Sequence, residues 1–199
     1  MTLLPLDAPG EDPLAVFAAW HREAAAAMPD PDAAALATAT PDGVPSVRFV
    51  LLRGIDADGV RFFTNYGSRK GDELAANPRA AVAWFGWPIR RQVRVEGTVA
   101  MLPARESDEY FAHRDRGHQL GAHASAQSSP IEERATLERA YADAELRFEG
   151  TDVSRPEHWG GYLLAASAVE LWLQREDRLH DRFAYTREPE GWSAVRLAP

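Results

Sequence analysis

The feature that most constrains this chain is a series of short β-type runs that are separated by turn residues. In RQVRVEGTVAML, residues 91–102, Val93, Val95 and Val99 alternate with polar residues, which is typical of a strand with one buried face. The turn signals PDG and DADG bracket another such run, PSVRFVLLRGI. Further strands are expected at residues 33–40, 45–55, 59–65, 80–86, 161–173, 182–188 and 192–199. Antiparallel strands therefore form the framework of the expected fold.

Helical signals interrupt these strands. Asp12 followed by Pro13 predicts a helix start, and Leu14, Phe17 and Trp20 would then share one apolar face through about residue 26. Other helices are expected after Ser68, over residues 103–113, and from the capping-box pattern Ser129–Glu132 to about Gly150. Many strands broken by a few helices favour an α+β fold built on a β-barrel.

Composition bounds the function. The 199 residues suit one domain, which we expect over residues 12–199 behind a flexible arm at residues 1–11. A formal net charge of −8 argues against a nucleic-acid-binding surface. The chain has no cysteine, no apolar run long enough to span a bilayer and no secretory pattern, so we expect a cytoplasmic protein without a membrane partner.

A basic turn between a strand and a helix is the first candidate site. In Thr64–Lys70, backbone N–H groups at a helix start, the Ser68 hydroxyl and two cations could bind a phosphate. Arg48 lies in a mostly apolar strand, where its charge requires a partner or an anion. Gln92 could read the edge of a heterocycle. The alternatives are a solvated basic turn and polar residues on wet strand faces.

The densest polar cluster is RLHDR. As a strand it would place Arg178, His180 and Arg182 on one face, where three potential cations favour an anionic ligand; the alternative is an exposed charged hairpin. His113, His118 and His123 recur every five residues, which suits no common zinc spacing, so no metal site is expected. No GxGxxG motif indicates a dinucleotide fold.

The order of these blocks resembles the pyridoxine/pyridoxamine 5′-phosphate oxidase family. The matching stretches are RFVLLR, FFTNYGSRKG, RQVRVEG, QLGAHASAQSS, HWGGY, RLHDRFAY and the closing RLAP. The resemblance implies an FMN-binding split β-barrel with peripheral helices, and a homodimer with FMN at its interface. It also implies an oxidase that uses dioxygen, releases hydrogen peroxide and produces pyridoxal 5′-phosphate.

The resemblance assigns roles to individual residues. It implies FMN contacts at Arg48, Val50, Leu51, Arg53, Phe63, Thr64, Ser68, Arg69, Lys70, Gln92, Gln127, Ser128, Trp172 and Arg182. It places Gln127 and Ser128 across the dimer interface from the other FMN contacts. Substrate contacts are implied at Arg53, Tyr110, Arg114, His118, Arg178 and His180, of which Arg178 and His180 are the catalytic candidates.

The chain departs from the family pattern at the substrate positions. Arg53 replaces the usual Lys, His118 the usual phosphate-binding Ser and His123 the usual Trp, and residues 1–11 lack the family's basic, Tyr-containing segment. Two alternatives therefore stay open beside the vitamin B6 oxidase. One is a flavin oxidase of another ring compound, of the phenazine-pathway type, and the other is an FMN-binding protein without turnover.

Overall fold

The computed structural model describes residues 12–199, so the arm expected at residues 1–11 lies outside the described residues. Eight strands form one antiparallel sheet: β1 (Ala33–Ala39), β2 (Pro45–Asp56), β3 (Gly59–Asn65), β4 (Arg79–Gly86), β5 (Arg91–Met101), β6 (Trp159–Leu173), β7 (Asp181–Glu188) and β8 (Gly191–Arg196). The helices are α1 (Pro13–Ala25), α2 (Arg69–Ala76), α3 (Ala104–Ala112), α4 (Arg116–Ala124) and α5 (Arg134–Arg147), with short 3₁₀ turns η1 (Trp87–Ile89) and η2 (Glu176–Arg178).

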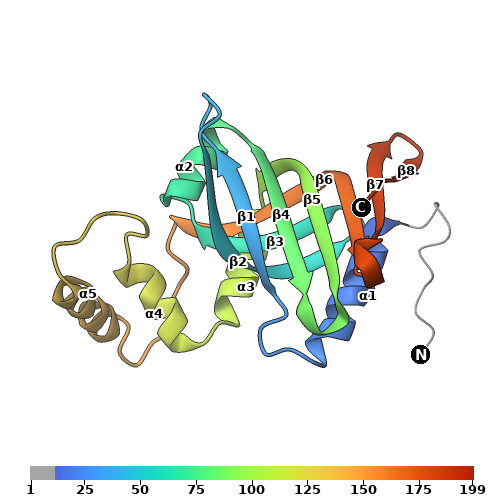
Figure 1. Ribbon diagram of the computed structural model, residues 1–199. Helices are drawn as coiled ribbons and strands as arrows, with labels where there is room; N and C mark the ends of the chain where they lie inside the picture. Colours follow the sequence, from blue (N-terminus) through green and yellow to red (C-terminus); the bar gives the residue numbers. More distant parts are fainter. Residues whose placement is uncertain (1–11) are drawn as a thin grey trace.

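The sheet closes into a barrel. Its strand order is β3-β2-β1-β4-β5-β6-β7-β8, and an extra pairing between β3 and β6 joins the first strand to the sixth. The first half of β6 pairs with β3, and its last residues pair with β7, so β7 and β8 extend outside the barrel. Figure 1 shows the barrel between α4 and α5 on one side and the β7–β8 hairpin on the other. The expected α+β split barrel is confirmed.

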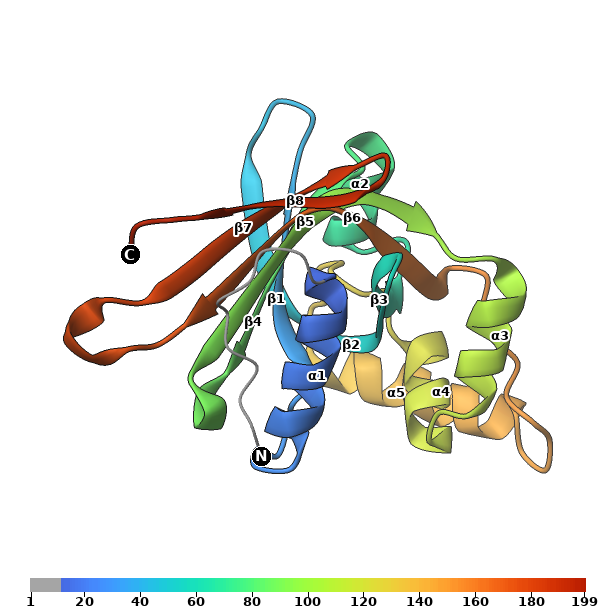
Figure 2. The same cartoon turned by 90° about the vertical axis from the view of Figure 1, so that its right-hand side faces the viewer.

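The first helix completes the barrel core. Asp12 accepts a hydrogen bond from the Leu14 N–H at 3.0 Å, and Pro13 opens α1, as the sequence predicted. Leu14, Phe17 and Trp20 are all buried, and α1 packs against β2, β4 and β6. Figure 2 shows α1 in front of these strands. The predicted apolar face of this helix is therefore confirmed.

A second, smaller core joins α3, α4 and α5. Phe111, Leu120, Phe148 and Trp159 pack together there, away from the barrel interior. The sequence analysis missed α4, because Leu120 is its one buried apolar residue and gives no helical periodicity. None of the helices within residues 12–199 is both long and apolar enough to cross a membrane.

The predicted start of the longest helix is wrong. Helix α5 begins at Arg134, after Glu133 in an extended conformation, instead of at the Ser129 capping box. Ser128 adopts a left-handed φ of 73°, and the Ser129 N–H donates to the Ala126 carbonyl at 3.0 Å. Ser129 therefore belongs to a turn that ends the preceding segment, and it cannot cap a helix.

Candidate functional site

A cleft of about 560 Å³ lies where β2 and β3 meet α3, α4 and the segment after α4. Eight residues that the sequence analysis assigned to cofactor or substrate line it: Leu51, Arg53, Phe63, Thr64, Tyr110, Arg114, His118 and Gln127. Three further lining residues were not predicted from the sequence: His113, Asp115 and Trp159. His113 adjoins Arg114, and Trp159 opens β6 within the HWGGY block, so proximity to assigned residues was the available signal.

The basic turn builds one end of this site. The Asn65 side chain accepts from the Gly67 N–H at 2.8 Å, and its Nδ2 donates to the Ser125 carbonyl at 3.3 Å. The turn therefore anchors the segment that carries Gln127. Ser68 precedes α2 as predicted but forms no side-chain cap, since its hydroxyl donates to the Asn65 carbonyl at 2.7 Å. Gly71 lets the first turn of α2 approach the Tyr66 backbone closely, because a Cβ at position 71 would lie 1.9 Å from the Tyr66 carbonyl oxygen.

Lys70 is a buried cation with neutral partners. Its Nζ donates to Thr64 Oγ1 at 3.0 Å, Ser68 Oγ at 2.9 Å and Gln127 Oε1 at 2.6 Å. Burial, with a smaller effect of the Arg48 charge, lowers the pKa of Lys70 to about 8. Within residues 12–199 no carboxylate forms an ion pair with it. A cation held in this way is suited to an incoming anion.

The other two basic residues of the predicted phosphate cluster share one carboxylate. Glu73 accepts from Arg69 Nε at 2.9 Å and lies 3.4 Å from Arg48 Nη2. Burial would raise the pKa of Glu73, but hydrogen bonds from Ser46, Thr38 and Arg69 outweigh burial and lower it to about 2. Arg48 therefore has an internal partner, which makes Lys70 the less neutralised cation of the cluster.

Arg114, at the other end of the cleft, also forms no ion pair within the described part of the chain. Its guanidinium lies 4.5 Å from the Trp159 ring centre, and its buried Nη1 has no hydrogen-bond partner there. Burial lowers the pKa of Arg114, the Arg53 charge adds to this decrease, and Tyr110 opposes it. Tyr110 in turn stacks on Phe63 at 3.9 Å between ring centres. An aromatic wall therefore holds Arg114 at the cleft.

The remaining cofactor candidates form a separate row on β5, β6 and β7. Gln92 pairs with Trp172, and Trp172 pairs with Arg182, so the three side chains share one sheet face at spacings of about 4.8 Å. The His180 ring packs on Trp172 with 4.6 Å between ring centres. Arg182 also donates to Glu170 at 3.0 Å. We call Gln92, Trp172, His180 and Arg182 the strand-row group.

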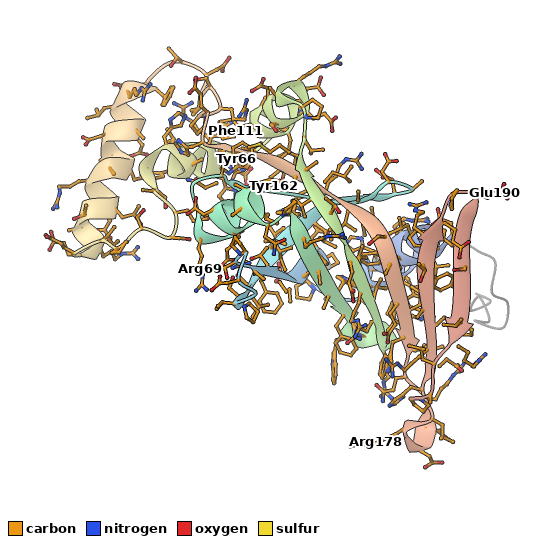
Figure 3. The ribbon with its side chains drawn as sticks, turned by 90° about the horizontal axis from the view of Figure 1, so that it is seen from above. Tyr66, Arg69, Phe111, Tyr162, Arg178 and Glu190 are labelled. Carbon is orange, nitrogen blue, oxygen red and sulfur yellow. The ribbon has the colours of Figure 1, made fainter. Side chains whose placement is uncertain are left out.

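The expected strand through RLHDR is wrong. Arg178 ends η2 with a left-handed φ of 62°, and β7 begins only at Asp181. The sheet ladder therefore aligns Arg182 alone, and Arg178 and His180 leave the shared face that alternation predicted. Figure 3 shows Arg178 and Phe111 at opposite ends of the molecule. Phe111 directly follows Tyr110, which lines the cleft. One chain therefore does not bring Arg178 to Tyr110 and Arg114.

The structure also places four further residues that the sequence singled out: Val50, Gln127, Ser128 and His123. The Val50 side chain packs in the barrel core, so it does not face the cleft. Gln127 was expected across the dimer interface from the other FMN contacts, but it binds Lys70 of its own chain. Ser128 follows it in the same turn. The His123 ring packs against the Phe148 ring with 4.7 Å between ring centres, and its Nε2 lies 2.7 Å from the Ser154 carbonyl oxygen. His123 does not line the cleft.

The fold and the cleft together define an antiparallel split-barrel protein with a cleft that Arg114 and the contacts of Lys70 make a candidate anion site. The family model described as pyridoxamine 5′-phosphate oxidase matches residues 21–148. A second model, the pyridoxine 5′-phosphate oxidase C-terminal dimerisation region, matches residues 159–199. The chain belongs to the pyridoxamine 5′-phosphate oxidase family, and the second match supports a homodimer.

Individual relatives agree with this assignment. The chain is 53% identical to a pyridoxine/pyridoxamine 5′-phosphate oxidase of Rubrobacter xylanophilus, over 97% of this chain and 89% of that one. It is 46% identical to the protein of the same name from Gluconobacter oxydans, over 100% of both chains. Among solved structures, PhzG of Burkholderia lata 383 in complex with tetrahydrophenazine-1-carboxylic acid is 32% identical, with a TM-score of 0.92 over 100% of this chain and 98% of that chain.

The residues present fit FMN, the cofactor of this family. A phosphate requires cations and donors without competing acids, which Lys70, Thr64 and Ser68 provide. A flavin ring requires an amide and an aromatic surface, which Gln92 and Trp172 provide on one row. The two sets lie on different parts of one chain.

Proposed function

We propose that this protein is an FMN-dependent oxidase that converts pyridoxamine or pyridoxine 5′-phosphate to pyridoxal 5′-phosphate. The observation that carries this proposal is a pair of cations at one cleft: half-buried Arg114 lines it, and buried Lys70 contacts two of its lining residues, Thr64 and Gln127. Neither forms an ion pair within residues 12–199. Two such cations suit two phosphates, one on the cofactor and one on the substrate. The proposed enzyme is a single domain over residues 12–199 and works in the cytoplasm.

The cleft residues hold and orient the reactants. Lys70, Thr64 and Gln127 bind the cofactor phosphate, and Arg69, Arg48 and Glu73 keep the surrounding charge balanced. When bound, FMN would accept the hydride that leaves the C4′ carbon of the substrate, and dioxygen would then accept the electrons. For the amine, water and dioxygen are consumed, and ammonia and hydrogen peroxide leave; for the alcohol, dioxygen is consumed and hydrogen peroxide leaves.

The substrate phosphate binds at the opposite set of residues. Arg114 donates from its unpartnered guanidinium nitrogen, and Tyr110, His118 and Arg53 add donors around it. Trp159 and the stacked pair of Phe63 and Tyr110 exclude water from the apolar side of the cleft. These contacts would hold the ring so that its C4′ carbon faces the cofactor.

A homodimer completes the site. Because no member of the strand-row group lines the cleft of its own chain, and Arg178 lies far from Phe111 (Figure 3), a two-fold axis can supply them from the partner subunit. Trp172, Arg178, His180 and Arg182 all lie in the matched dimerisation region. The outer face of β2 also exposes Val47, Phe49 and Leu51, a strip suited to burial between subunits. This arrangement is our proposal for FMN at the interface.

A flavin oxidase of another ring compound is the second candidate. The favouring observation is the similarity in fold and sequence to PhzG, together with His118 and His113 at the cleft in this chain. His123, which sequence analysis also weighed in favour of this alternative, does not support it, because it packs on Phe148 instead. Arg53 and Arg114 both line the cleft. Two guanidinium groups suit the double negative charge of a phosphate better than the single charge of a ring carboxylate.

Peroxide release by the FMN-loaded protein tests the proposal. We expect turnover with pyridoxamine and pyridoxine 5′-phosphate, and a much higher KM for the same vitamers without phosphate. Tetrahydrophenazine-1-carboxylic acid, the compound bound in the PhzG structure, serves as the comparison substrate. Turnover with this acid alone would support the second candidate. No peroxide from any substrate at millimolar concentration would contradict both oxidase assignments and support an FMN-binding protein without turnover.

A further inference from the structure

Three residues from separate elements form a chain that ends at the cleft. Nη1 of Arg53, on β2, donates to Oδ2 of Asp32, just before β1. Nε2 of His21, on α1, lies 3.0 Å from the other carboxylate oxygen, Asp32 Oδ1, within ion-pair distance but without hydrogen-bond geometry. Arg53 lines both the cleft and a neighbouring hollow of about 410 Å³ that His21 and Asp32 also line. These three side chains therefore connect the outside of the barrel to the substrate side of the cleft.

Arg53 needs this support because it lies in a β-bulge. Leu52 pairs with Phe62 and Gly54 pairs with Arg61, which leaves Arg53 without a partner on β3. On the other side, the ladder between β1 and β2 begins with the pair Ala33–Leu51. Bulges redirect side chains near active sites. Without an ion-pair partner, the long Arg53 side chain would sample many rotamers, which costs binding energy when a ligand selects one.

Asp32 is itself fixed from two sides. Its carbonyl accepts from the Leu52 N–H at 2.9 Å, and the preceding Pro31 carbonyl accepts from Trp84 Nε1 at 2.7 Å. His21 packs between Phe17 and Trp84, with ring centres 6.5 Å and 5.9 Å away. The carboxylate therefore has a defined position from which to hold Arg53.

Asp32 also separates the roles of the two cleft arginines. Arg53 lies close enough to Arg114 for its charge to lower the pKa of Arg114, in addition to the larger effect of burial. Asp32 pairs with Arg53, whereas Arg114 has no ion pair among residues 12–199. The carboxylate therefore reduces the repulsion between the two guanidinium groups and holds Arg53 as a directed hydrogen-bond donor, while Arg114 keeps its full charge for an anion.

We propose that Asp32 is a positioning residue for Arg53, that His21 supports it, and that the pair sets the affinity of the cleft for its phosphorylated ring substrate. This inference rests on the proposed function. It explains how an arginine can serve at a position where the sequence resemblance implies a lysine. The two groups differ in shape, and an arginine fork is useful only when its plane is fixed.

A double-substitution cycle tests the positioning role. On the FMN-loaded protein, Asp32→Asn should raise the KM for pyridoxamine 5′-phosphate by about five- to twentyfold. The kcat should change less than about twofold, since Asp32 does not reach the substrate. In protein that already carries Arg53→Met, Asp32→Asn should change KM by less than about twofold. Asp32→Glu should recover most of the wild-type KM, and His21→Asn should cause a smaller rise that disappears once Asp32 is replaced.

Binding provides a second readout. The four proteins of the cycle are the wild type, Asp32→Asn, Arg53→Met and the double variant. They are titrated with pyridoxal 5′-phosphate by calorimetry, and the dissociation constants should show the same coupling as KM. FMN content and thermal midpoints verify folding. Asp58→Asn is the matched control, because it removes an acid that lies 3.7 Å from Arg61, away from the cleft, and it should leave KM unchanged.

The outcomes are distinct. Equal changes in KM with and without Arg53 would show that Asp32 acts through the fold alone, and would overturn the positioning role. Wild-type protein that binds pyridoxal 5′-phosphate but shows no coupling would overturn this inference and leave the proposed function intact. Wild-type protein that neither oxidises nor binds any vitamin B6 phosphate would overturn both.

Discussion

The ammonium nitrogen of Lys70 lies 2.6 Å from Oε1 of Gln127, a residue 57 positions further along the chain. The contact joins the start of α2 to the segment after α4, and it places a buried positive charge beside the cleft. Neutral hydroxyl and amide oxygens satisfy its hydrogens without neutralising it. A negatively charged group can therefore bind Lys70 by replacing one of these three neutral acceptors.

Replacing Lys70 should weaken FMN binding more than any exposed cation would. We expect Lys70→Met to cost about 1.5–3 kcal/mol, the value of a hydrogen bond to a charged group. The dissociation constant should rise about 10- to 150-fold, measured by quenching of flavin fluorescence. Arg134→Met, on the exposed face of α5, is the control and should have no effect. An unchanged FMN affinity in Lys70→Met would remove Lys70 from the phosphate site.

The lowered pKa of Lys70 should make FMN binding weaker at alkaline pH. Burial lowers this pKa from 10.5 to about 8, so the charged form destabilises the ligand-free fold at pH values below 8. This cost is relieved as the pH rises from 8 to 10.5, and stability from this group increases over that window. Phosphate binding requires the charged form, so FMN affinity should fall by up to about tenfold per pH unit above pH 8. Titrations from pH 7 to 10 measure it.

The control for this pH dependence is Lys70→Met, whose FMN affinity should stay nearly constant over the same range. A wild-type affinity that is equally constant would show that Lys70 stays charged beyond pH 10 or does not contact the phosphate. Circular dichroism at each pH verifies that the fold is intact.

Glu73 should stabilise the fold in a pH-dependent way. It is buried and accepts hydrogen bonds from Ser46 and Arg69 at 2.5 and 2.9 Å. Glu73→Gln should lower the free energy of unfolding by roughly 1–3 kcal/mol at neutral pH. Because the folded pKa is about 2, below the ordinary 4.5, this stabilisation is present above pH 4.5 and is lost as the pH falls toward 2. Urea unfolding at pH 7 and pH 3 should show the difference shrinking, and a constant difference would contradict it.

Local patterns predicted those parts of the molecule that are determined locally. The alternation in residues 91–102 gave β5, and Asp12 with Pro13 gave the start of α1. The turn from Thr64 to Lys70 could be named as a candidate anion site because its charged and hydroxyl groups lie in consecutive residues. Trp172 and Gln92 could be assigned only through the family resemblance, since their shared row depends on strand register.

Long-range contacts produced the errors. Nothing near Arg48 in the sequence indicates Glu73, although its spacing of four from Arg69 was a usable signal for one of its two ion pairs. Arg178 was placed on a strand because alternation in RLHDR cannot reveal the left-handed turn at this residue. Asp32 and His21 were not predicted either, because their proximity to Arg53 depends on a bulge in β2 that the local sequence does not indicate.

Two defective subunits should restore one active site when they form a mixed dimer. Arg114→Ala removes the anion site of the cleft, and Arg178→Ala removes a residue that the partner would supply, so each homodimer should lose most turnover while retaining FMN. In the mixed dimer, one cleft combines an intact Arg114 with an intact Arg178, because a two-fold axis pairs each cleft with the opposite subunit. Doubly tagged mixed dimers should therefore release peroxide at about half of the wild-type rate. A wild-type subunit paired with a subunit that carries both Arg114→Ala and Arg178→Ala is the control and should stay as inactive as the single-variant homodimers, since each cleft then lacks one of the two arginines. Recovery in the control, or none in the test pair, would contradict a site that is shared between subunits.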